Sequence, residues 1–268
     1  MLILAAGGRG PGRTCVCEKM TTSSAYRLSD NERTKSMRAR HMVVSVCMVF
    51  LAAFPEATAQ LQVNADIMSR YIWRGLDFGN SPSFQPALTV AVGNLRIGTW
   101  GAYSVGAQGG SAFAEHDLWA SYSVQNAAGT FTAIYTDYYY PSAGLKYFDY
   151  GGKGSGAHTL EVGLGYALAE DIPVTLTGYV NVHNDPDNSV YLQANYLLRV
   201  DGVSLDIFAG FTASRGAWYA ASNASMINIG VKATRSVVVT ESFSIPVSAA
   251  FIINPHLEQS YLTLGISF

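Results

Sequence analysis

The sequence LTLGISF occupies residues 262–268, where the chain ends. Its apolar residues alternate with small or polar ones, so Leu262, Leu264, Ile266 and Phe268 share one face of an extended strand. The other face carries only threonine, glycine and serine. The pattern predicts a β-strand with one continuous apolar face that ends in an aromatic side chain.

The front of the chain has the features of a secretory signal peptide. MRARH (37–41) is cationic, residues 42–54 are an apolar run, and ATA (57–59) matches an A-x-A cleavage site. The apolar run is shorter than the ~20 residues that a membrane-spanning helix needs. We therefore expect residues 37–59 to be removed and the mature chain to comprise residues 60–268.

Residues 1–36 are polar and precede a better start at Met37. We interpret them as the product of a start codon assigned too far upstream or as a disordered segment. An unusually long cationic region of the signal peptide is the alternative.

The mature chain has a simple composition. All three cysteines precede residue 60, so disulfides cannot stabilise it, and a core or a closed sheet must do so. Eight of the 17 Lys and Arg also precede residue 60, which leaves 9 against 15 Asp and Glu. This acidic balance argues against a nucleic-acid partner.

Period-2 alternation recurs throughout residues 60–268, and no window there has a helical period. Each alternating segment is about 10 residues long, which matches the ~9–11 residues of a tilted membrane-spanning strand. The twelve predicted strands cover residues 61–74, 88–92, 95–105, 116–124, 130–139, 160–166, 174–183, 190–199, 203–212, 225–235, 243–251 and 261–268.

The connections between these strands alternate in length. Tight turns are expected at 93–94, 126–129, 170–173, 201–202 and near Thr240, whereas loops as long as YPSAGLKYFDYGGKGSGA (140–157) separate the other pairs. Tight turns at one end, longer loops at the other and an even strand count are typical of outer-membrane barrels. The sequence therefore predicts an all-β fold: a closed antiparallel up-and-down transmembrane β-barrel in the cell outer membrane. A periplasmic lipocalin-like barrel and a sandwich are the soluble alternatives.

Several segments resemble a family of small Gram-negative outer-membrane barrels known only as candidate porins. They are SRYIWRG (69–75), SPSFQPAL (81–88), IGTWGAYS (97–104), EHDLWASY (115–122), DYYYP (137–141) and HTLEVGLGY (158–166). The resemblance implies contact with outer-membrane lipids, and it implies an assembly machinery that reads the terminal strand with Leu262, Leu264, Ile266 and Phe268. It implies no substrate and no catalytic residue.

If the apolar faces turn outward, the opposite faces enclose a lumen. Its ten predicted charges, five of each sign, are Asp66, Arg70, Arg74, Arg96, Asp117, Asp137, Glu161, Arg199, Asp206 and Lys232. They could create a field that orients dipolar solutes in a pore, or they could pair and close the lumen. Because the signs balance, strong ion selectivity is not expected.

Aromatic residues at strand ends suit the interfacial girdle of a membrane barrel, although the core of a sandwich would also use them. The residues assigned to this girdle are Tyr71, Trp73, Tyr138, Tyr139, Tyr140, Trp218 and Tyr219.

The function that these features favour is a narrow passive pore for small polar solutes, without enzymatic activity. One alternative is a structural or adhesive barrel with a lumen closed by salt bridges, in which the loop at residues 140–156 would bind a partner. The other is a lipid hydrolase with His116 as base, although Ser121 and Ser123 lie on the opposite face of that strand. No motif indicates a cofactor or a metal, and NDPDN (184–188) reads as a turn more readily than as a weak Ca²⁺ site.

Overall fold

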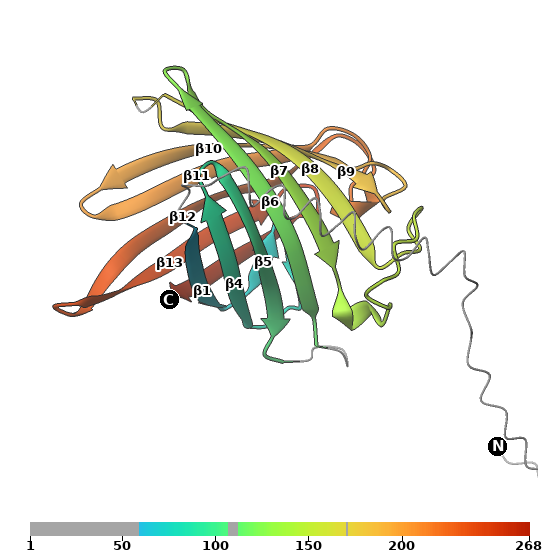
Figure 1. The fold of residues 1–268 in the computed structure, drawn as a ribbon, viewed down its shortest axis with the longest axis horizontal. Helices are drawn as coiled ribbons and strands as arrows, with labels where there is room; N and C mark the ends of the chain where they lie inside the picture. Colours follow the sequence, from blue (N-terminus) through green and yellow to red (C-terminus); the bar gives the residue numbers. More distant parts are fainter. Residues whose placement is uncertain (1–58, 107–111, 170) are drawn as a thin grey trace, which may run out of the picture. The chain divides into compact units, whose positions relative to one another are not determined.

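A computed structural model describes residues 59–106, 112–169 and 171–268. Twelve strands form a closed antiparallel barrel in the order β1-β14-β13-β12-β11-β10-β9-β8-β7-β6-β5-β4 (Figure 1). They are β1 (Gln60–Met68), β4 (Ser83–Val92), β5 (Leu95–Ser104), β6 (Ala114–Asn126), β7 (Gly129–Tyr139), β8 (His158–Leu168), β9 (Val174–His183), β10 (Val190–Val200), β11 (Val203–Thr212), β12 (Ser225–Thr240), β13 (Phe243–Asn254) and β14 (Gln259–Ser267). The predicted all-β, closed, twelve-stranded architecture is confirmed.

The remaining elements are short. A hairpin of β2 (Tyr71–Trp73) and β3 (Leu76–Phe78) lies between β1 and β4, and two 3-10 turns, η1 (Pro141–Ala143) and η2 (Ala217–Tyr219), lie in later loops. No helix within the described ranges is long and apolar enough to cross a membrane. The predicted signal peptide, residues 37–59, falls almost entirely outside the described residues.

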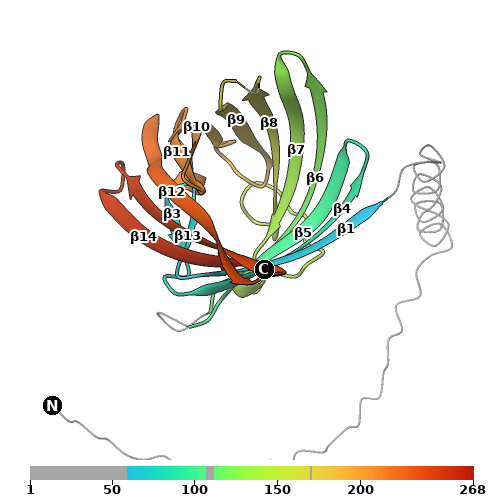
Figure 2. The ribbon, with the colours of Figure 1, turned by 90° about the vertical axis from the view of Figure 1, so that its left-hand side faces the viewer.

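The barrel closes where β1 meets β14 (Figure 2). The pairs are Asp66 with Ser267, Ile67 with Ile266 and Met68 with Gly265. The amide N–H of Phe268 also donates to the Ala65 carbonyl, over 2.9 Å. These bonds give the terminal strand a partner on each side, because β13 pairs with its other edge.

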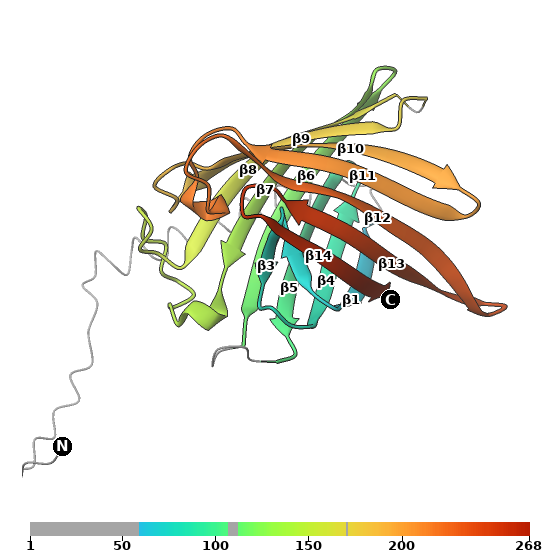
Figure 3. The ribbon, with the colours of Figure 1, turned by 180° about the vertical axis from the view of Figure 1, so that it is seen from behind.

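Turn length differs between the two ends of the barrel. At one end, here called the short-turn end, four of the five turns have two residues, and the β12–β13 hairpin reaches furthest (Figure 3). Connections at the other end, the long-loop end, range from four residues at 255–258 to eighteen at 140–157. Asp201 and Gly202 illustrate the tight turns, since both have positive φ, as two-residue hairpins require.

Polarity is inverted relative to a protein with an apolar core. Side chains such as Leu164 and Leu262 point outward and are about 70% exposed, with fractions of 70% and 71%. Buried positions of the described ranges are more often polar or charged than apolar; Asn181 and Asn254, for example, have no exposed surface. Alternation along each strand produces this result directly, because successive Cβ atoms point to opposite faces.

The first strand is shorter than predicted. Alternation through Tyr71 and Trp73 suggested one strand over residues 61–74, but β1 ends at Met68 and the chain turns into the barrel. Arg74 (φ +50°) and Gly75 (φ +78°) form the two-residue turn between β2 and β3. We call residues 71–78 the lumenal hairpin.

A register shift corrects the prediction for Ile227. Regular alternation through the predicted strand at 225–235 would put Ile227 on the outer face with Ile229 and Val231, but its side chain is completely buried. Phe211 pairs with Met226 and Gly210 pairs with Asn228, so Ile227 is the extra residue of a β-bulge. The bulge turns Ile227 toward the lumenal hairpin, whose Gly75 would place a Cβ only 1.9 Å from the Ile227 carbonyl oxygen.

The predicted aromatic girdle is largely wrong. Tyr71, Tyr138 and Tyr219 are almost fully buried, and Trp73 packs between Tyr138 and Tyr219. Of the seven residues, Tyr139 lies on the outer face, one position after the inward-facing Tyr138. The aromatic residues that do point outward include Phe84, Tyr103, Tyr122, Phe131, Tyr196, Phe211 and Phe243.

Candidate functional site

The lumenal hairpin crosses the interior of the barrel near the long-loop end. The Tyr71 ring lies 5.2 Å from that of Trp100 on β5, and the Trp73 ring lies 5.8 Å from both Tyr138 on β7 and Tyr219 in η2. Asn254, at the end of β13, donates its amide to the Gly75 carbonyl over 3.0 Å. The hairpin is therefore attached to walls on opposite sides of the barrel.

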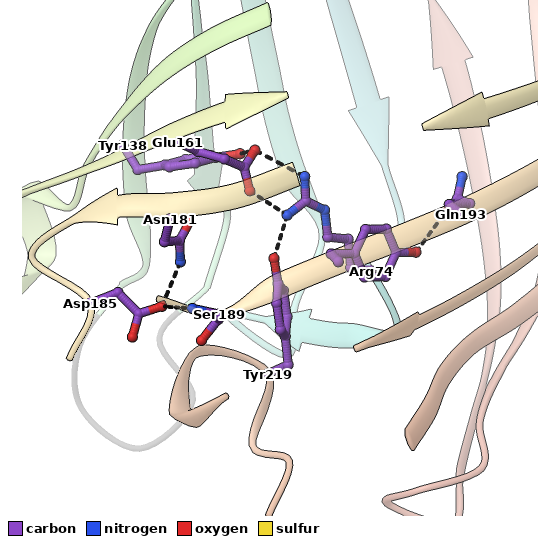
Figure 4. Close-up of polar contacts among 9 residues, drawn as sticks. Arg74, Tyr138, Glu161, Asn181, Asp185, Ser189, Gln193 and Tyr219 are labelled. Atoms are coloured by element: carbon purple, nitrogen blue, oxygen red, sulfur yellow. Dashed lines mark hydrogen bonds and ion pairs between the residues drawn. The ribbon is translucent and has the colours of Figure 1, made fainter. Parts of the chain in front are cut away.

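Arg74, at the tip of the hairpin, makes the principal polar contacts (Figure 4). Its Nη1 donates to Glu161 Oε2 over 2.5 Å and its Nη2 to Glu161 Oε1 over 3.0 Å, a bidentate pair. The same Nη1 contacts the Tyr219 hydroxyl at 2.5 Å, and the Tyr138 hydroxyl donates to Glu161 at 2.9 Å. Both charged side chains are buried, with 9% and 1% exposed.

Aromatic rings surround the Arg74 guanidinium. Its central carbon lies 4.3 Å from the Trp73 ring centre, 4.2 Å from that of Tyr179 and 4.6 Å from that of Tyr191. Contacts of this kind are cation–π interactions, which strengthen when water is excluded. The left-handed backbone of Arg74, uncommon for a side chain of this size, is held by these contacts.

A chain of amide and hydroxyl groups extends from this site along the inner wall. The Asn228 amide donates to the Tyr191 hydroxyl over 2.9 Å, and the Gln193 amide donates to Asn195 over 2.8 Å. Asn195 in turn donates to both carboxylate oxygens of Asp206 over 3.0 Å. Polar groups of β10, β11 and β12 thus connect the Arg74 site with the short-turn half of the lumen.

The loop at residues 184–189 is a hydrogen-bonded turn. Asp185 accepts hydrogen bonds from Asn181 (2.9 Å) and from the Ser189 amide (2.8 Å). Partial burial alone would raise the pKa of Asp185, but the hydrogen bonds from Ser189, Asn181 and Asp187 outweigh it and lower the pKa. Asp187 accepts from the Ala217 amide over 3.0 Å, which holds η2 and Tyr219 in place.

Most of the predicted lumenal charges lie on the inner face. Seven of them occupy inward positions of the wall: Asp66, Arg96, Asp117, Glu161, Arg199, Asp206 and Lys232. Arg74 is also lumenal, but it is carried by the hairpin and not by a wall strand. Arg70 lies just before the hairpin and contacts Asp77 and Asn80, with 37% of its side chain exposed.

Asp137 was predicted to line the lumen, and the structure places it on the outer face. It shares the alternation of Phe131 and Tyr135, and it pairs with the outward-facing Leu118. Asp137 Oδ1 lies 2.7 Å from His158 Nδ1, and the Tyr150 ring stacks on His158 at 4.0 Å. The loop at 140–157 folds over these polar groups and buries them.

Among the described residues, the proposed lipid-hydrolase base His116 is hydrogen-bonded to a tyrosine and not to a serine. His116 Nε2 lies 2.6 Å from the Tyr103 hydroxyl. Within the described part of the chain, the hydrogen-bond partners of His158 are Asp137 and the Tyr147 carbonyl, and His183 contacts the Tyr150 carbonyl. In these described ranges, no serine forms a hydrogen bond with any of the three imidazoles.

Sequence reasoning did not identify the hairpin or its ring of tyrosines. The available signal was Trp-Arg-Gly at residues 73–75, in which a glycine follows a long alternation and allows a tight turn.

The fold and the site together define the class of protein: a closed twelve-stranded antiparallel β-barrel with a hairpin packed inside one end. The sequence matches no protein-family model and no curated protein.

Proposed function

We propose that the protein is an outer-membrane β-barrel that acts as a porin-like, narrow passive pore for small polar solutes. The observation that carries the proposal is the position of the lumenal hairpin, which narrows the lumen at the long-loop end and leaves the short-turn half unfilled by it. The interior of an eight-stranded barrel can be filled by side chains alone. A twelve-stranded barrel encloses a wider interior.

The outer surface supports a membrane setting. Apolar side chains cover the outer face of the described strands, and a surface of this extent is unusual for a protein surrounded by water. Closure of the barrel gives the backbone N–H and C=O groups of every wall strand hydrogen-bond partners, which lipid cannot supply. Outward-facing Tyr122, Phe131 and Tyr196 at the short-turn end, with Phe84 and Tyr103 at the other, suit the two membrane interfaces.

The lumenal half near the short turns supports passage of polar solutes. Arg96, Arg199 and Lys232 point inward there and are exposed, whereas inner-face residues near the long loops, such as Glu161 and Asn181, are buried. Solutes entering from the short-turn end would therefore meet charged, solvated walls before they reach the hairpin.

A second candidate function is a structural or adhesive barrel with a permanently closed lumen. The bidentate Arg74–Glu161 pair and its surrounding rings favour it, because separating a buried ion pair is costly. Passage of solutes distinguishes the two proposals.

We expect the protein to be recovered in the outer-membrane fraction with a native amino terminus at Gln60. Mass spectrometry of the membrane-extracted protein measures both properties. A chain that keeps residues 37–59, or one found in the inner membrane or cytosol, would contradict the proposal.

Solute passage is expected to depend on size. Proteoliposomes containing the protein should swell in arabinose and fail to swell in the tetrasaccharide stachyose, because the hairpin narrows the path. Vesicles with no protein supply the control. Absence of swelling in both sugars would favour the structural or adhesive barrel.

A further inference from the structure

A cavity of about 380 Å³ lies between the lumenal hairpin and the wall formed by β4, β5, β6 and β7. Tyr71 and Trp73 of the hairpin line one side, and Trp100, Trp119 and Tyr138 line the wall. Five aromatic side chains thus line a space of the size that small-molecule sites occupy.

The rings around this cavity are held in place by packing. The Tyr71 and Trp100 planes are inclined by 55°, and those of Trp73 and Tyr138 by 72°. Trp119 lies so close to the β5 backbone that a Cβ on Gly98 would come within 2.6 Å of its ring. The rings can therefore offer π-surfaces to a ligand without rearrangement, and such surfaces attract cations.

Among the described residues, one carboxylate lines this aromatic cavity. Asp117, on β6, has only 7% of its surface exposed, and its Oδ1 atom is buried without a hydrogen-bond partner among the described residues. Buried polar atoms are nearly always paired, so an unpaired carboxylate oxygen in a cavity indicates a missing partner.

The local charge balance indicates the sign of that partner. Glu115, two residues earlier on the same face, is 2% exposed and also has an unpaired oxygen, Oε2. Arg74 is already paired with Glu161, and in the described part of the chain neither Glu115 nor Asp117 has a basic side chain within 4 Å. A cationic ligand would supply the missing counter-charge.

The lining favours an organic cation over other ligands. A metal ion requires several oxygen or nitrogen ligands, and the described residues contain no group of three His, Cys, Asp or Glu arranged to hold one. A sugar would need several hydrogen-bonding groups, but apart from Asp117 and Thr136 the lining consists of aromatic rings, Ala87 and Ile134. Aromatic faces around a carboxylate suit a substituted ammonium group.

We propose that this cavity, with Asp117 at its wall and the rings of Tyr71, Trp73, Trp100, Trp119 and Tyr138 around it, binds a small organic cation with a substituted ammonium group. Binding of the cation in this cavity does not depend on the proposed pore function. Passage of such cations through the lumen does depend on it.

Isothermal titration calorimetry of the purified protein, expressed from the full-length chain, with choline tests the site. Choline should bind, and its uncharged isostere 3,3-dimethylbutan-1-ol should bind at least tenfold more weakly, because it lacks the charge. Asp117→Asn should weaken choline binding at least tenfold, and Trp100→Leu should weaken it less. Asp171→Asn, which removes an exposed carboxylate from the β8–β9 turn, is the matched control and should bind like the wild type.

Two further readouts separate the possible failures. Asp117→Asn should fold at least as well as the wild type, as seen from heat-modifiable migration on gels, because asparagine has nearly the same shape and Asp117 Oδ1 has no hydrogen bond to lose among the described residues. If the protein binds choline but passes no solute, the proposed cation site is supported and the proposed pore function is refuted. Failure of the wild type to bind choline, equal binding of the uncharged isostere, or unchanged binding by Asp117→Asn would overturn the proposal.

Discussion

Replacing Glu161 with glutamine is expected to destabilise the barrel by ~3–5 kcal/mol, the range found when one partner of a buried ion pair is removed. Arg74 uses both terminal nitrogens on Glu161, and the Tyr138 hydroxyl donates to the same carboxylate. A glutamine cannot neutralise the guanidinium, which would stay buried with its charge uncompensated. Equilibrium unfolding in guanidinium chloride, followed by tryptophan fluorescence in lipid vesicles, measures the change.

Two variants calibrate this result. Glu241→Gln removes a carboxylate from an exposed turn and should leave the free energy of unfolding within ~0.5 kcal/mol of the wild type. The double variant Arg74→Met with Glu161→Gln removes both charges and should recover most of the lost stability. If Glu161→Gln alone unfolds like the wild type, the Arg74–Glu161 pair does not hold the hairpin.

Removing the lumenal hairpin is expected to have the largest effect on passage through the barrel. Exchange of residues 70–80 for a short glycine–serine linker would eliminate Arg74 and the rings of Tyr71 and Trp73, which meet opposite walls. The exchange is best combined with Glu161→Gln, so that no buried carboxylate loses its counter-charge. The wall strands pair independently of the hairpin, so the barrel should still close.

The barrel itself was predictable because its signal is distributed over the whole of residues 60–268. Every wall strand alternates, and alternation places Leu262 outward and Thr263 inward without any knowledge of the partners. Turn chemistry at Gly93-Asn94 and Asp201-Gly202 separated the strands correctly. The period of the apolar residues and the identity of the turn residues are local properties, which can be read directly from a sequence.

The hairpin was missed because its residues continue the same alternation. Tyr71 and Trp73 fall in phase with Leu61 and Ile67, so local pattern alone extends the first strand. What turns the chain inward is tertiary: the buried partner Glu161 is 87 positions away, and Tyr219 is 145 positions away. Local periodicity carries no information about contacts of that range.

Asp137 shows the same limit for a single side chain. Its charge suggested the lumen, but its phase on β7 places it outside with Tyr135. The loop at 140–157 supplies the cover that makes this possible, through Tyr147 and Tyr150 against His158. For Asp137, the position in the strand alternation predicts the face of the barrel better than the charge of the side chain does.

Single-channel conductance in planar bilayers tests most directly the claim that the lumenal hairpin limits passage. Small steps are expected for the wild type, and steps at least threefold larger for the variant with residues 70–80 replaced by a glycine–serine linker in the Glu161→Gln background. Glu241→Gln should match the wild type. Equal conductance of the wild type and a correctly folded hairpin-replaced variant would contradict the account.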